Sequence, residues 1–302
     1  MDVTTEVARL KAERDAVILA HYYVPSETQA LADYVGDSFY LARLARTLDC
    51  STIVLCGVSF MAESAKMLNP ERTVLLPDPT ADCPMAHMVR KEDVETVKAR
   101  YDDLAVVCYI NSMADIKALS DICVTSSNAL KVVRSLPQKN IFFIPDGNLG
   151  RYVAAQVPEK NIILNKGFCH VHASITARDL EAALHAHPAA EIIAHPECSE
   201  EVCNLAEYLG STKELIEYVR TAPAQEFIVC TEQGVLHEMQ KVAPGKQFHF
   251  VGARQICPNM KRITLEKVRD SLLNGSPVVT VDEALRQKAS VPLERMLAAA
   301  QG

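Results

Sequence analysis

An internal repeat limits the possible folds of this chain more than any other feature. Three short apolar runs end in polar residues, AVILAHYY, LAVVCYIN and AEIIAHPE, and their equivalent positions His21, Tyr109 and His195 lie 88 and 86 residues apart. From each position a hydroxyl residue follows after 17 residues, a second apolar run is reached after 35, and a cysteine follows after 62, 60 and 62. The alternative is an ordinary alternation of strands and helices with accidental matches, but four landmarks in three copies favour a repeat.

Each copy has the pattern of a strand, a helical stretch, a helix, a strand, a helix and a strand. Strands that alternate with helices indicate βαβ crossovers and parallel sheets covered on both faces. The sequence therefore predicts an α/β fold of three pseudo-threefold-related, three-layer αβα domains around a central cavity. We place these domains at residues 1–84, 85–172 and 173–260, followed by a C-terminal helical tail, 261–302, that packs back on the body.

Composition excludes several functional classes. The 302 residues carry 31 basic and 38 acidic side chains, a net charge of −7, with no basic run for nucleic acid to bind. No segment reaches the roughly 20 apolar residues of a membrane-spanning helix, and we expect no export signal. Ten cysteines without such a signal favour a reducing, cytoplasmic location, in which thiols are buried, catalytic or metal-bound.

Polar residues at the strand ends predict a ligand pocket, because ligands of open parallel sheets bind beyond the carboxyl ends of the strands. Each end carries a pair at positions i and i+2, which share a face if the strand persists. A hydroxyl residue then stands where a helix begins. Each hydroxyl alone fits a plain N-cap, but three together favour a pocket for carboxylate or phosphate groups. The pairs are His21 with Tyr23, Tyr109 with Asn111 and His195 with Glu197, and the hydroxyl residues are Ser38, Ser126 and Thr212.

The three repeat-related cysteines, Cys83, Cys169 and Cys257, each follow the last strand of their copy. Pseudo-threefold symmetry lets equivalent residues meet at the axis, where three thiolates suit either an iron–sulfur cluster or a zinc ion. Either metal centre would keep one coordination position free of protein ligands. The remaining cysteines in apolar or helical surroundings are expected to be buried small hydrophobic residues.

The segment KGFCHVH, residues 166–172, holds Cys169 and two histidines and resembles a zinc site at first sight. Neighbouring side chains would point to opposite sides if this segment is extended. Of the two histidines, we expect His172 rather than His170 to line the cavity. The other histidines outside the strand ends are assigned to surfaces or helix caps.

Several long motifs resemble those of the quinolinate synthase family: AHYYVPSETQALADYVGDS, GVSFMAESAKMLNP, CYINSMADIKALSDICVTSSNA, KGFCHVH and IAHPECSEEV with GSTKELIEY. The likeness extends from about residue 10 to about residue 275 and is to the type without an N-terminal extension. Longer relatives carry CxxCxxC at the last ligand, whereas RQICPNM has Cys257 alone, so a disulfide switch there is not expected.

The resemblance implies three homologous domains around one [4Fe–4S] cluster per chain, with Cys83, Cys169 and Cys257 as its ligands. It implies condensation of iminoaspartate (iminosuccinate) with dihydroxyacetone phosphate to quinolinate, phosphate and water in NAD biosynthesis. An iminoaspartate-producing oxidase or dehydrogenase is then an expected partner. The resemblance also makes Tyr23 an acid–base residue, and our hypothesis is that His195 and Glu197 transfer protons while Tyr23 and Tyr109 orient the three-carbon substrate. The implied substrate pocket comprises His21, Ser38, Tyr109, Asn111, Ser126, His195, Glu197 and Thr212.

Two alternatives remain at this level. The same cysteines would serve a zinc-dependent lyase or hydrolase, and a metal- or redox-sensing binding protein would use the repeat as a ligand cleft without turnover.

Overall fold

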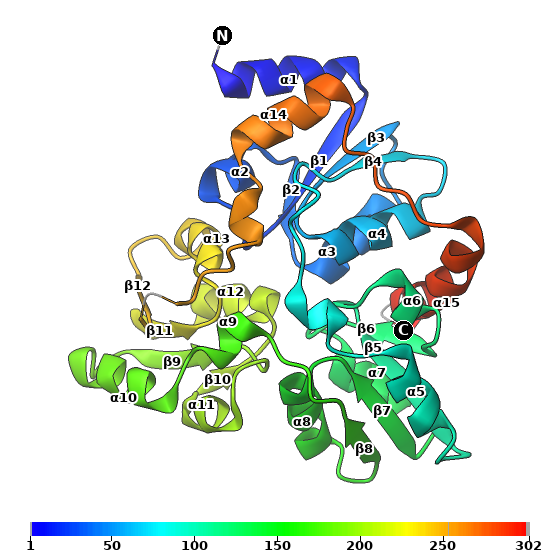
Figure 1. The fold of residues 1–302 in the computed structure, drawn as a ribbon. Helices are drawn as coiled ribbons and strands as arrows, with labels where there is room; N and C mark the ends of the chain where they lie inside the picture. The colour runs from blue at the N-terminus through cyan, green and yellow to red at the C-terminus, as the bar shows by residue number, and fades with distance from the viewer. Residues whose placement is uncertain (1, 253, 300–302) are drawn as a thin grey trace.

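The computed structural model describes residues 2–252 and 254–299 and contains three four-stranded parallel sheets (Figure 1). The strand orders are β2-β1-β3-β4, β6-β5-β7-β8 and β10-β9-β11-β12. The same order therefore occurs three times along the chain. This confirms the predicted α/β class and the repeat behind it, and each sheet with its helices is called a unit below.

The first unit shows why these segments form parallel strands. All five residues of β3 are buried, and β1 is buried at five of six positions, as expected for strands with helices on both faces. The Asp37 side chain caps α3 by accepting a hydrogen bond from the backbone N–H of Tyr40. The strands are β1 (Ala16–His21), β2 (Tyr34–Gly36), β3 (Thr52–Cys56) and β4 (Thr73–Leu75), and the helices are α1 (Val3–Glu13), α2 (Ser26–Leu31), α3 (Ser38–Ala45) and α4 (Ser59–Leu68).

The second unit repeats this arrangement. A short 3₁₀ helix, η1 (Pro84–His87), and α5 (Lys91–Lys98) lead into it. Its strands are β5 (Leu104–Tyr109), β6 (Ile122–Val124), β7 (Asn140–Ile144) and β8 (Asn161–Leu164), and its helices are α6 (Ala114–Lys117), α7 (Ala129–Ser135) and α8 (Gly147–Gln156).

The third unit has a separate hydrophobic cluster on each face of its sheet. Ile192 and Ile228 pack with the side of α10 and α11, whereas Ile193 and Val229 pack with the side of α12 and α13. This alternation is that of a three-layer domain. The strands are β9 (Glu191–Ala194), β10 (Tyr208–Leu209), β11 (Glu226–Cys230) and β12 (Gln247–Phe250), and the helices are α9 (His170–Ala173), α10 (Ala177–Ala186), α11 (Glu200–Leu205), α12 (Thr212–Thr221), η2 (Gln233–Val235) and α13 (Leu236–Val242).

The C-terminal segment returns to the first two units. After η3 (Met260–Arg262), helix α14 (Leu265–Asn274) packs along α1, and α15 (Glu283–Ala299) packs against α4, α6 and β6. One hydrophobic cluster accordingly joins the first unit, the second unit and this segment. The exact division of the chain at residues 84, 172 and 260 remains a prediction.

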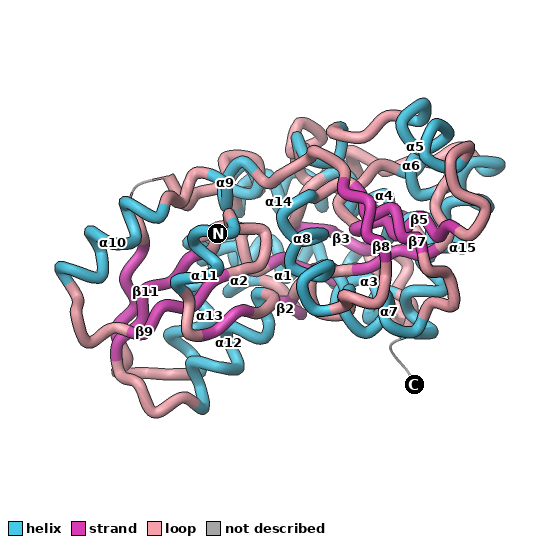
Figure 2. The backbone as a smooth tube through the Cα atoms, turned by 90° about the horizontal axis from the view of Figure 1, so that it is seen from below, coloured by secondary structure: helices cyan, strands magenta, loops and turns pink. Residues whose placement is uncertain are grey.

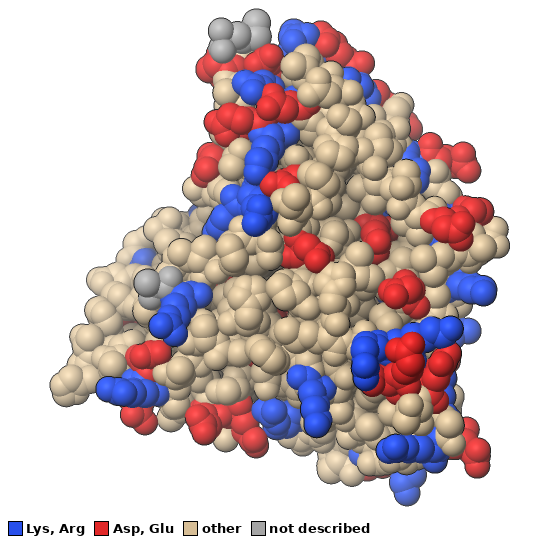
Figure 3. Space-filling view, viewed as in Figure 1, with Lys and Arg blue, Asp and Glu red and all other residues tan. Residues whose placement is uncertain are grey.

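Charged side chains of both signs lie on the surface. Lys and Arg are interspersed with Asp and Glu on the face shown in Figure 3. Among the described residues, no helix combines the length and the apolar character needed to cross a membrane. The three units surround a central region in the ribbon view (Figure 1). In the view turned by 90°, α10 of the third unit and α5 at the start of the second lie at opposite ends of the molecule (Figure 2).

Candidate active site

One cavity is lined by residues of all three units. Every sequence-predicted site residue lies on its wall, although these residues come from positions far apart in the chain. The structure therefore brings together the whole predicted set, which is His21, Tyr23, Ser38, Cys83, Tyr109, Asn111, Ser126, Cys169, His172, His195, Glu197, Thr212 and Cys257. His170 lines the cavity as well, so the expected choice of His172 over His170 is wrong.

The paired polar residues lie at or just beyond the carboxyl ends of β1, β5 and β9, and the second residue of each pair is positioned by a turn rather than by the strand. Strand β1 ends at His21 and β5 at Tyr109, while β9 ends one residue before His195. The residues two positions further on lie in turns, so the expected i, i+2 sharing of a strand face is wrong. The turns fold back instead, and the rings of His21 and Tyr23 meet edge to face with their centroids 4.6 Å apart.

The hydroxyl residues lie near helix starts, but other side chains cap the helices. Ser38 and Thr212 are the first residues of α3 and α12, and the caps are Asp37 and Ser211. Ser126 lies in a turn before α7, which begins only at Ala129, so its predicted place at a helix start is wrong by about one turn. Since neighbouring residues cap α3 and α12, the hydroxyls of Ser38 and Thr212 remain available to the cavity.

A chain of hydroxyl groups crosses the boundary between the first and third units. The Tyr23 hydroxyl lies 2.6 Å from Thr212 Oγ1 and 2.9 Å from Thr231 Oγ1. Thr231 Oγ1 in turn lies 2.9 Å from His172 Nε2. Burial raises the pKa of Tyr23 well above its ordinary value, so its hydroxyl keeps its proton at neutral pH. Protons can therefore pass between Tyr23 and His172 through Thr231.

Thr231 was not predicted, and a signal for it exists in the sequence. It directly follows strand β11 in EFIVCTE, at a carboxyl strand end like the residues that were selected. Glu232, the next residue, was missed for the same reason. The predicted polar residues lay only at the ends of the first strand of each copy, whereas β11 is the second long strand of its copy.

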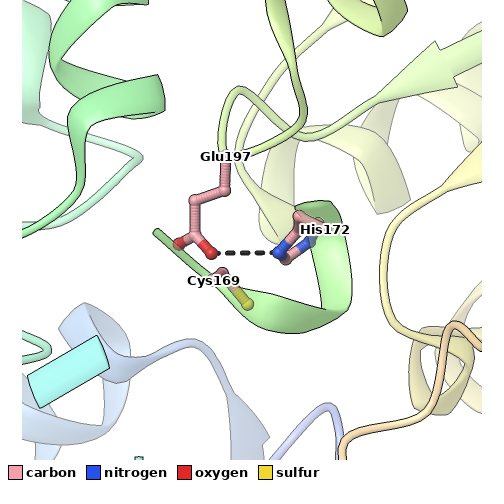
Figure 4. Close-up of side chains that lie close together, drawn as sticks. All are labelled: Cys169, His172 and Glu197. Carbon is pink, nitrogen blue, oxygen red and sulfur yellow. Dashed lines mark ion pairs between the residues drawn. The ribbon is translucent and has the colours of Figure 1, made fainter. Parts of the chain in front are cut away.

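Glu197 is a buried carboxylate at the centre of the site. Cys169 caps the short helix α9, so Cys169 and His172 lie on one helical turn rather than on an extended strand. In Figure 4 this turn faces Glu197, whose Oε2 lies 2.9 Å from His172 Nδ1. The Tyr109 hydroxyl donates a hydrogen bond to Glu197 Oε1. Burial raises the pKa of the Glu197 carboxyl, but the contacts with His172, His195 and Tyr109 together outweigh burial and lower this pKa to about 2.

His21 and His195 adopt the same hydrogen bond in two copies of the repeat. His21 Nδ1 accepts from the backbone N–H of Tyr23 at 3.2 Å, and His195 Nδ1 accepts from that of Glu197 at 3.2 Å. Burial lowers the pKa of both imidazoles to about 3, so both are neutral at neutral pH. A neutral ring that accepts at Nδ1 carries its proton on Nε2. Both rings thus retain an N–H donor that a substrate carboxylate or phosphate can use.

The neutral state of His21 predicts a pH-dependent loss of stability. The unfolded chain takes up a proton near pH 6.5, whereas the folded chain resists it down to about pH 3, so stability falls as the pH decreases through this window. Between pH 7 and pH 5, His21 should account for about 2 kcal/mol of lost unfolding free energy. Urea unfolding at both pH values should therefore show a smaller loss in His21→Gln than in the wild type. Equal losses in the two proteins would contradict the buried neutral imidazole.

The three cysteines occupy equivalent, half-buried places on the cavity wall. Cys83 precedes η1, Cys169 caps α9 and Cys257 lies shortly before η3. Burial raises the pKa of all three thiols, that of Cys83 to about 12, so a cationic group is needed to hold them as thiolates. Among the described residues, the ligating atoms that converge within 4.8 Å do not include this trio. Three thiolates about 2.3 Å from one zinc ion would lie closer together than that, so the sulfurs as placed are too far apart for a single zinc ion.

The loop of Cys257 is held by a buried ion pair. Glu232 is 1% exposed, and its Oε1 accepts a hydrogen bond from the Cys257 N–H at 2.9 Å. Lys261 Nζ lies 2.9 Å from the same oxygen and donates to the Tyr23 carbonyl at 2.6 Å. Glu232 and Lys261 therefore connect the backbone of Cys257 to the backbone of Tyr23.

Comparison with known proteins shows which family the chain belongs to. The family model described as Quinolinate synthetase A protein matches residues 5–298. A protein named quinolinate synthase from Fusobacterium nucleatum is 50% identical over 96% of this chain and 97% of its own length. Proteins of the same name from Caldicellulosiruptor bescii and Methanoregula boonei are 49% and 47% identical, each over 97% of this chain and 96% and 97% of their own lengths. The chain belongs to the quinolinate synthetase A family.

Proposed function

We propose that this chain is a quinolinate synthase, which condenses iminoaspartate with dihydroxyacetone phosphate to quinolinate, phosphate and water. The observation that carries this proposal is that three cysteines, one from each repeat, line the same cavity as the predicted polar residues. Membership of the family and near-complete coverage of relatives with this name support it. The proposal places the enzyme in the cytoplasm, where thiols stay reduced, and requires an oxidase or dehydrogenase that supplies iminoaspartate.

We assign Cys83, Cys169 and Cys257 as ligands of one [4Fe–4S] cluster. When bound, such a cluster with three protein ligands supplies an iron that acts as a Lewis acid toward substrate oxygen or nitrogen. The separation of the sulfurs, which is too wide for one zinc ion, supports this assignment over zinc. Glu232, through the Cys257 N–H, acts as a positioning residue.

The chain's own residues then divide into binding and proton-transfer roles. Both substrates are anions, and the Nε2–H groups of His21 and His195, with the hydroxyls of Ser38, Ser126 and Thr212, give them neutral donors. Asn111 adds an amide to the same wall. A cavity of neutral donors binds carboxylate and phosphate groups without requiring a dense cluster of cations.

Proton transfer is assigned to two groups on opposite sides of His172. Glu197, ionised at neutral pH, accepts a proton at Oε1, the oxygen that Tyr109 contacts. Tyr23 donates from its hydroxyl and is reprotonated through Thr231. Acid–base groups placed in this way contribute about 10²–10⁴-fold each to the rate.

The direct test is product formation. Anaerobically purified, reduced protein is mixed with dihydroxyacetone phosphate and freshly generated iminoaspartate, and quinolinate is quantified by chromatography. We expect quinolinate and phosphate in equal amounts, and none when either substrate is omitted. Cluster-loaded protein that binds the substrates without forming quinolinate would contradict the proposal and favour a sensing protein.

A further inference from the structure

A second group of metal-ligating side chains lies in the third unit, at the opposite end of strand β11 from the cavity. Glu226 is the first residue of β11, and His249 lies on the edge strand β12. His187 is the C-cap residue of α10. Helix α10 lies at the periphery of the molecule in both Figure 1 and Figure 2. The group is therefore separate from the candidate active site, which is formed at the carboxyl ends of the strands.

The register of the sheet brings these three side chains together. Glu226 pairs with Gln247, so His249, two residues further along, lies on the same face as Glu226. The side chain of Ile228 on this face packs with Leu180 of α10. His187, the C-cap residue of α10, therefore lies over the same face of the sheet, and its imidazole contacts the side chains of Glu226 and His249 there.

The distances are those of ligands around one ion. His187 Nδ1 lies 3.0 Å and His249 Nε2 lies 2.8 Å from the same oxygen, Glu226 Oε1. Ligands at about 2.0–2.2 Å from a metal ion lie about 3 Å apart in octahedral geometry and about 3.5 Å apart in tetrahedral geometry. All three ligating atoms also lie within 4.8 Å of one another.

The orientation of the His249 ring relative to Glu226 also indicates a metal site. His249 Nε2 is buried and has no hydrogen-bond partner, although it lies 2.8 Å from the carboxylate oxygen. The nitrogen and oxygen are thus close without being aligned with each other. Close but misaligned donor and acceptor atoms are expected when their lone pairs converge on a common point beside them. The hydrogen bond between His187 Nδ1 and Glu226 Oε1 therefore accounts for only one of the two His–Glu contacts.

The surroundings suit a partly open metal site. The imidazoles of His187 and His249 are stacked, with centroids 3.5 Å apart and an interplanar angle of 17°, which fixes both rings. The described residues that line the adjoining hollow include Asp179 and no lysine or arginine to compete with a cation. Water from this hollow can complete the coordination.

We propose that His187 Nδ1, Glu226 Oε1 and His249 Nε2 bind one divalent transition-metal ion. Two imidazoles and one carboxylate suit zinc, iron, cobalt or nickel and disfavour magnesium or calcium. The bound ion joins the end of α10 to strands β11 and β12 and so stabilises the third unit. This inference is independent of the proposed function, because none of its residues lines the active-site cavity.

Zinc uptake by the anaerobic, cluster-loaded enzyme tests the proposal. The probe is Zn²⁺ itself, titrated calorimetrically at pH 8 and counted by elemental analysis after desalting. We expect about one zinc per chain in the wild type and at least about tenfold weaker binding in His249→Ala and in Glu226→Gln, because each variant loses one ligand. The variant His185→Ala is the matched control, since His185 is an exposed residue on the same helix outside the group.

A second readout separates this site from zinc bound in the cavity, where Cys169, His172 and Glu197 also converge. Zinc should raise the thermal midpoint of the wild type and of His185→Ala but not that of Glu226→Gln, whose side chain keeps the size of the original. Retention of the cluster in each variant confirms that it is folded. Absence of zinc uptake in the wild type, or equal uptake in wild type, His249→Ala and Glu226→Gln, would overturn the proposal.

Discussion

Replacing Cys169 with alanine is expected to remove the cluster and essentially all quinolinate formation together. Cys169 is one of only three proposed ligands, and it is the N-cap residue of α9 at the cavity wall, where no other cysteine of the second unit lies. Two thiolates cannot hold a cubane that already has one open corner. The visible absorption of anaerobic protein and the quinolinate assay should therefore be lost in the same variant.

Cys50→Ala is the control for this experiment. Cys50 is buried in the hydrophobic cluster of the first unit and does not line the cavity. The variant should keep the wild-type absorption and activity, although the lost packing lowers stability. A Cys169→Ala protein that retains a full cluster and turns over would contradict the ligand assignment.

Replacing Glu197 with glutamine is expected to lower kcat by about 10²–10⁴-fold while the cluster is retained. Glutamine keeps the size of the side chain but cannot accept a proton at Oε1. It also removes the charge that His172 and the Tyr109 hydroxyl contact. The measurement is steady-state quinolinate formation, with iron content determined on the same sample.

Glu201→Gln is the control for this experiment, because it makes the same substitution at an exposed position. Glu201 lies on α11, four residues beyond Glu197, with its side chain in solvent. Its kcat should equal that of the wild type. If Glu197→Gln also equals the wild type in kcat, Glu197 is not the proton acceptor, and the hydrogen bond from Tyr109 has a structural role only.

The repeat made the fold and the membership of the site predictable, because equal offsets along homologous units lead to equivalent points in space. His21, Tyr109 and His195 reach one cavity for this reason. Offsets do not determine which of two adjacent residues caps a helix. Asp37 and Ser211 therefore took the capping role that Ser38 and Thr212 also fitted.

The direction in which side chains point was the second feature that the sequence could not predict. The sequence KGFCHVH does not distinguish an extended segment from one helical turn, and only the turn of α9 places Cys169 and His172 on the same side. The group of His187, Glu226 and His249 depends on strand register and on where α10 ends. No spacing in the sequence signals it, and these histidines had been assigned to surfaces or caps.

The iron and sulfide content of anaerobically purified protein tests the central claim most directly. The account predicts about four iron atoms and about four labile sulfide ions per chain, in protein that is brown. Iron should fall with the loss of any one of Cys83, Cys169 and Cys257. Colourless protein that contains zinc at these cysteines and no labile sulfide would contradict the account.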